Sequence, residues 1–78
     1  MPPTQIELNV FTARNELKKL RFAQTGDRAT SDMLYYEVLM ENFGVTSMKE
    51  LKTDQQRMQL ADLLNQKIQF LRDQDKEE

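Results

Sequence analysis

The chain has 78 residues, with 13 acidic and 11 basic side chains and a formal net charge of -2, which fits one small domain spanning residues 1–78. It contains no cysteine and no histidine, which excludes disulfides, zinc sites built from these residues and catalysis by a histidine base. No apolar run approaches the roughly 20 residues of a membrane span, and the start, Met1 to Thr4, does not resemble a signal peptide, so we expect a cytoplasmic protein.

A first helix is predicted over about residues 4–23. Thr4 and Glu7 have the spacing of a capping box, in which each side chain bonds the other residue's backbone N–H. Apolar residues then recur at helical spacing: Ile6, Val10, Ala13, Leu17 and Leu20. A second apolar line that includes Phe11 and Phe22 lies away from this stripe, so we expect the helix to contact more than one neighbour.

A central helix is predicted over about residues 32–43, after a loop at 24–30, with Ser31 or Asp32 as its cap and Gly44 as its end. It is apolar on two sides. We expect one arc to be buried by the other helices: Met33, Tyr36, Leu39, Met40 and Phe43. The opposite arc is Leu34, Tyr35 and Val38, and the pattern leaves open whether this second arc completes the core or forms an interface.

The remaining chain predicts a short helical turn near 48–52 and a last helix over about 54–72. Ser47 and Glu50 repeat the capping-box spacing, and Thr53 with Gln56 does so again. Residues 73–78 are charged and predict a frayed acidic tail. The predicted fold is an all-α, compact bundle of three main helices.

Five segments together resemble the small helical phage proteins related to the GemA regulatory protein of Mu-like phages. The likeness spans roughly residues 14–71, and the segments that carry it are Leu17-Lys18-Lys19-Leu20, Tyr35-Tyr36-Glu37-Val38-Leu39, Phe43-Gly44-Val45-Thr46-Ser47, Lys49-Glu50-Leu51 and Asp54-Gln55-Gln56. The resemblance implies a non-enzymatic protein of a phage or mobile element that acts on host regulation or DNA metabolism. It implies no catalytic residue.

The surplus of apolar faces favours a non-catalytic interaction or regulatory module. Its partner would be a host protein or a second copy of the chain, and in the second case the protein would form a homodimer. The predicted partner-binding residues are Leu34, Tyr35, Val38, Phe11 and Phe22. No cofactor is expected.

Two other uses of polar side chains remain as alternatives. A basic stripe on the first helix could bind the phosphates of DNA or RNA, and its residues are Arg14, Lys18, Lys19 and Arg21. Glu37 and Glu41 are one helical turn apart and could ligate a hard cation, but the sequence specifies no further ligands. We therefore expect these carboxylates to be solvated or salt-bridged, and we expect neither a metal site nor an enzyme.

Overall fold

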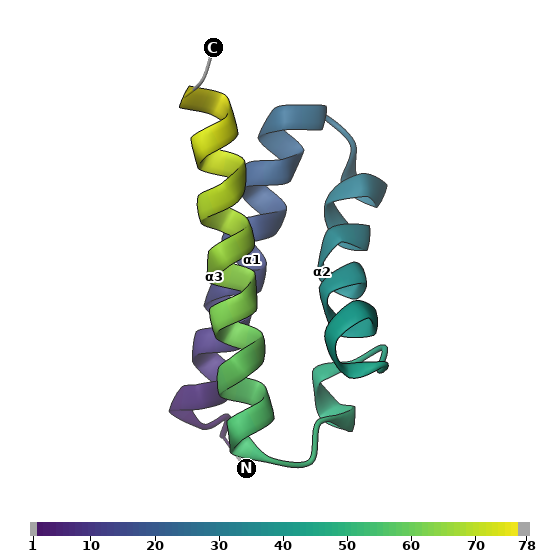
Figure 1. Ribbon diagram of the computed structural model, residues 1–78, viewed down its shortest axis with the longest axis vertical. Helices are drawn as coiled ribbons and strands as arrows, with labels where there is room; N and C mark the ends of the chain where they lie inside the picture. Colours follow the sequence, from purple (N-terminus) through teal and green to yellow (C-terminus); the bar gives the residue numbers. More distant parts are fainter. Residues whose placement is uncertain (1, 77–78) are drawn as a thin grey trace.

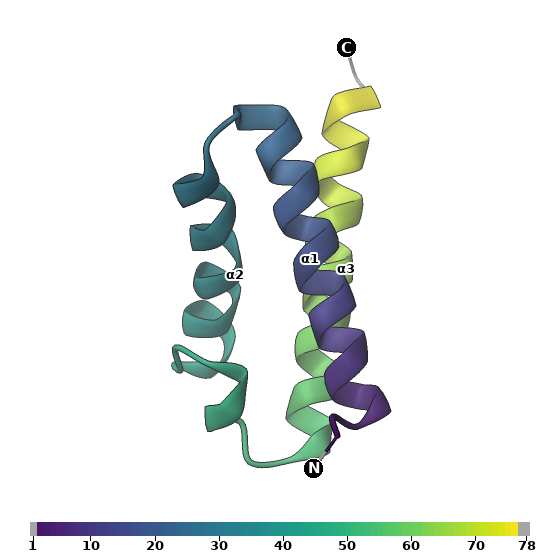
Figure 2. The same ribbon diagram turned by 180° about the vertical axis from the view of Figure 1, so that it is seen from behind.

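The computed structural model describes residues 2–76, and it confirms the all-α fold. Three long helices follow one another, α1 (Gln5–Thr25), α2 (Arg28–Phe43) and α3 (Asp54–Lys76), and a short 3₁₀ turn, η1 (Met48–Glu50), precedes the last of them. α1 and α3 run in the same direction side by side, and α2 runs antiparallel to both (Figures 1 and 2). A tight turn joins α1 to α2 at one end, and η1 lies at the opposite end.

The helix ends follow from local hydrogen bonding. The capping box of Thr4 and Glu7 is present at the start of α1, and a second capping box, of Ser47 and Glu50, begins η1. Thr53 accepts a hydrogen bond from the Gln56 N–H at the start of α3. Gly26 and Gly44 end α1 and α2 in the left-handed conformation, where a side chain would be strained.

Two predicted boundaries are wrong. α2 begins at Arg28 instead of residue 32, because the Asp27 carboxylate caps it by accepting hydrogen bonds from the Ala29 N–H and the Thr30 hydroxyl. Ser31, one of the two predicted caps, is buried inside the helix and donates its hydroxyl to the Asp27 carbonyl. The predicted loop at 24–30 thus shrinks to a turn at residues 26–27.

The second wrong boundary is at the end of α3. This helix passes the predicted end at 72 and continues through Lys76, so residues 73–76 are helical. A side-chain hydrogen bond of 2.9 Å from the Gln69 amide to the Asp73 carboxylate, one turn apart, supports the extension. The remainder of the predicted acidic tail, residues 77–78, lies outside the described residues.

One hydrophobic core joins the three helices and η1. Its buried members are Val10, Ala13 and Leu17 of α1, Leu34, Tyr35, Val38 and Leu39 of α2, Met48 and Leu51 of the η1 segment, and Leu60, Ala61, Leu64, Ile68 and Leu71 of α3. The stripe predicted for the first helix is confirmed at its centre, while its outer members Ile6 and Leu20 are half-buried. The core also takes in Leu51, as the short turn predicted.

The two apolar arcs of α2 do not divide between core and surface as predicted. Leu34, Tyr35 and Val38 are 9%, 5% and 7% exposed, so this arc completes the core, which is one of the two possibilities that the pattern left open, and the three residues are not accessible as the predicted partner surface. In the other arc only Leu39 is fully buried and Phe43 is half-buried. Periodicity could not decide between two apolar sides, because the rotation of α2 about its axis depends on what α1 offers it.

Candidate interaction surface

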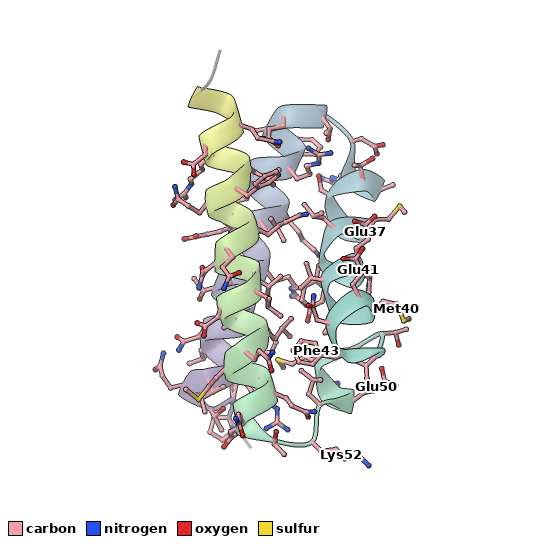
Figure 3. All side chains as sticks on the ribbon, viewed as in Figure 1. Glu37, Met40, Glu41, Phe43, Glu50 and Lys52 are labelled. Atoms are coloured by element: carbon pink, nitrogen blue, oxygen red, sulfur yellow. The ribbon has the colours of Figure 1, made fainter. Side chains whose placement is uncertain are left out.

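Three large apolar side chains of α2 face solvent and define the α2 outer stripe. Met33, Tyr36 and Met40 are 57%, 54% and 51% exposed, and their spacing of three and four residues places them on one side of the helix. With Glu37 and Thr46 they surround a shallow hollow of about 470 Å³. Figure 3 shows Met40 pointing away from α1 and α3, whereas Phe43 points toward the interior.

Two sets of contacts hold this stripe and its border in place. The rings of Tyr36 and the buried Tyr35 lie 5.8 Å apart between centroids in a tilted arrangement, so the exposed ring rests against a core residue. At the border of the hollow, the Thr46 N–H and hydroxyl donate to the Glu50 carboxylate at 2.8 and 3.0 Å. These hydrogen bonds lower the pKa of Glu50 and fix the segment that borders the hollow.

No other helix face gathers exposed apolar side chains so closely among the described residues. α1 exposes Leu8 and Phe22, and α3 exposes Met58 and Phe70, but each pair is separated by several turns. Isolated apolar residues of this kind are normal on a soluble surface, whereas a contiguous patch indicates a binding surface.

The residues predicted to bind a partner do not come together on one surface. Leu34, Tyr35 and Val38 lie in the core, and Phe11 is half-buried against it. Phe22 is 45% exposed and lies in a separate groove between α1 and α2, beside Lys18, Lys19 and Arg28. Helical spacing predicted that the three stripe residues would be buried, and spacing alone held no signal to the contrary.

Arg14 contacts Tyr35 on the inward face of α2. Its guanidinium lies 5.6 Å from the ring centroids of both Phe11 and Tyr35, so a half-buried cation joins α1 to α2. The Arg14 Nε is buried without a hydrogen-bond partner. Burial raises the pKa of the Tyr35 phenol, and the charge of Arg14 opposes that rise.

The other predicted nucleic-acid-binding residues are also mostly engaged within the protein. Lys18 forms a 3.2 Å salt bridge with Asp32 of α2. Arg21 donates to the Gln24 side chain at 3.3 Å, and the Gln24 amide in turn donates to the Leu71 carbonyl of α3. Lys19 is exposed, and with Lys18, Arg28 and Phe22 it lines an open groove of about 390 Å³.

The two carboxylates considered for a hard cation lie on α2. Glu37 and Glu41 are both exposed, and no described lysine or arginine lies within salt-bridge distance of either. Among the described side chains, which end at residue 74, no three carboxylates are close enough together to hold a metal ion. In the same part of the chain, no helix combines the length and apolar character needed to cross a membrane.

Comparison with known proteins does not add a family to this description. No protein-family model, curated protein or solved structure matches the chain.

Raising the pH above about 10 is expected to destabilise the protein through Tyr35. Because burial raises the pKa of this phenol above 10.0, the folded state keeps a proton that the unfolded state loses. The stabilisation is complete below the unfolded pKa and is lost as pH rises through the folded pKa. Urea unfolding between about pH 8 and pH 11 should show a smaller alkaline loss in Tyr35→Phe than in the wild type.

Tyr36→Phe is the matched control, because it removes the hydroxyl of the neighbouring exposed ring. It should retain most of the alkaline loss of the wild type, because burial raises the pKa of Tyr35 more than the charge of Tyr36 does. An equal alkaline loss in Tyr35→Phe and the wild type would show that Tyr35 is not its source.

Proposed function

We propose that this protein is a non-catalytic interaction module that binds a partner protein through the α2 outer stripe. The observation that carries the proposal is the exposure of Met33, Tyr36 and Met40, each by more than half, within about two turns of one helix. A chain this short has little apolar surface to spare, since its core supplies only a few kcal/mol of net stability. The exposure of three large apolar side chains in the free protein is explained if a partner protein covers them in the complex.

The chemistry of the stripe suits protein recognition. Methionine adapts its shape to a partner surface, and tyrosine supplies a large contact area at low conformational cost. Hot spots of protein interfaces are enriched in tyrosine and sit where water can be excluded. The support of Tyr36 by Tyr35 reduces the ordering cost that binding would otherwise incur.

The resemblance to GemA-related phage proteins supports a regulatory role in a phage or mobile element, and the absence of cysteine agrees with a cytoplasmic setting. The nucleic-acid alternative has less support. Arg14 and Lys18 make contacts between α1 and α2, and Arg21 bonds Gln24, so the predicted basic stripe presents mainly Lys19 for phosphate binding.

Substituting Met40 by Glu is expected to weaken partner binding by about 30-fold or more, because it places a charge at the centre of the apolar contact. A photocrosslinking residue at position 40 would capture the partner in a lysate of the native host, and the purified pair would then be measured by calorimetry. Met58→Glu is the matched control, since Met58 is a similarly exposed methionine on α3.

The control should bind within about threefold of the wild type. The proposal is contradicted if Met40→Glu binds the captured protein as tightly as the wild type does. It is also contradicted if position 40 captures no protein that position 58 does not.

A further inference from the structure

The α2 outer stripe has the spacing of one coiled-coil seam. Met33, Tyr36 and Met40 occupy the a, d and a positions of a heptad, and the next d position, Phe43, turns into the protein. A second helix that packs along α2 would therefore cover the stripe. The e and g residues of α2 would then lie beside the flanking residues of that second helix. In α2 the e position is Glu37, and the two g positions are Asp32 and Leu39, of which Leu39 is buried in the core.

The Glu37 edge of the stripe is acidic, whereas Asp32 on the opposite edge lines a groove together with the cations Lys18, Lys19 and Arg28. Glu37 lines the hollow, and Glu41 follows it one turn later on the same helix (Figure 3). Neither has a salt-bridge partner among the described residues. On the opposite edge Asp32 pairs with Lys18, but more than half of its side chain remains exposed. Lys52, in the connection after η1, lies at the lower end of the molecule in Figure 3, well below Glu37.

A second copy of the chain is a poor occupant of this stripe. In a parallel pair, the g position of one helix faces the e position of the other, which would set Asp32 against Glu37 of the second copy. In an antiparallel pair, like positions face one another, which would set Glu37 against Glu37. Both orientations bring carboxylates together at the rim of an apolar contact. The repulsion is stronger in the antiparallel pair, because Glu37 has no salt-bridge partner among the described residues whereas Asp32 is paired with Lys18.

Resting on the proposed function, we infer that the occupant of the α2 outer stripe is an amphipathic helix of another protein, with lysine or arginine flanking its apolar seam. Such a helix covers Met33, Tyr36 and Met40 with its apolar side and places a cation beside Glu37. The apolar contact supplies affinity, and the acidic rim selects basic helices and rejects a second copy.

Two synthetic helical peptides of about 21 residues, three heptads long, test this inference. Both carry leucine at a and d, and they differ only in having lysine or glutamate at every e and g position, which also keeps each peptide from pairing with itself. Fluorescence anisotropy with the full chain should show the lysine peptide binding about ten-fold more tightly at low salt, and the difference should shrink near 0.5 M salt. A scrambled lysine peptide without an apolar seam should not bind.

Two pairs of variants locate the binding. Met40→Glu should lose the lysine peptide while Met58→Glu retains it. Glu37→Lys should narrow or reverse the preference between the peptides, and Asp62→Lys, which makes the same charge change on α3 beside α1, should leave the preference intact. By sedimentation the wild type should stay monomeric up to about 0.5 mM.

The outcomes separate this inference from the proposed function. Equal binding of both peptides, with loss in Met40→Glu, would overturn the basic class of partner and leave the apolar surface standing. Failure of both peptides to bind would overturn the helical occupant, while the capture at position 40 would still decide the proposed function. Peptide binding that survives Met40→Glu would overturn both the inference and the proposed binding surface. A wild-type dimer that dissociates in Met40→Glu would overturn the exclusion of a second copy.

Discussion

Replacing Val38 by Asp is expected to unfold most of the protein, whereas Met40→Asp should leave it folded. Val38 is 7% exposed in the core between the helices, so its substitution would bury a carboxylate without a partner. That costs several kcal/mol, comparable to the whole stability of a domain of this size. Met40 is 51% exposed, and a carboxylate at that position stays in water.

Circular dichroism at 25 °C with urea titration of both variants measures the difference. The Val38→Asp spectrum should lose most of its helical signal, and Met40→Asp should unfold within about 1 kcal/mol of the wild type. The reverse result, a folded Val38→Asp and an unfolded Met40→Asp, would show that α2 turns its other face to the core. It would also remove the α2 outer stripe as a binding surface.

Leu64→Ala is expected to reduce the free energy of unfolding by about 2–5 kcal/mol. The Leu64 side chain is fully buried in the core, and its truncation leaves a cavity that the bundle can refill only in part. Phe70 belongs to the same broad apolar face of α3 in sequence, yet it is 54% exposed and lies beside the Lys67 ammonium. We expect Phe70→Ala to cost less than about 1 kcal/mol, despite the larger truncation.

Chemical denaturation with unchanged m-values checks this pair. The two losses should differ by at least about 1 kcal/mol. Equal losses would mean that the Phe70 ring is packed as firmly as the Leu64 side chain.

The sequence predicted those features that depend on neighbouring residues. The first capping box needs only Thr4 and Glu7, the second needs Ser47 and Glu50, and Gly44 ends α2 because of its own backbone freedom. The start of α2 was missed even though its cap is also local. Asp27 directly follows a helix-ending glycine, and the small polar residues after it suggested a longer loop.

The candidate surface was predicted only in outline. The sequence indicated that α2 has two apolar sides and that one of them is in excess, but it predicted that Met33, Tyr36 and Met40 would be buried, and these are the residues that face solvent. Of the predicted basic stripe, three members proved to be engaged within the protein, because their partners come from α2 or from the end of α1. Such partners are visible only once the helices are placed.

The sequence by itself determined three helices, most of their ends, and the amphipathic pattern that makes them pack as a bundle. These properties follow from hydrogen bonds and periodicity within single segments. The tertiary structure decided how α2 is rotated about its axis. A turn of residues 26–27 holds α2 close to α1, where Arg14 lies over the ring of Tyr35 and Lys18 reaches Asp32. These contacts turn one apolar arc into the core and leave Met33, Tyr36 and Met40 in solvent as the candidate binding surface.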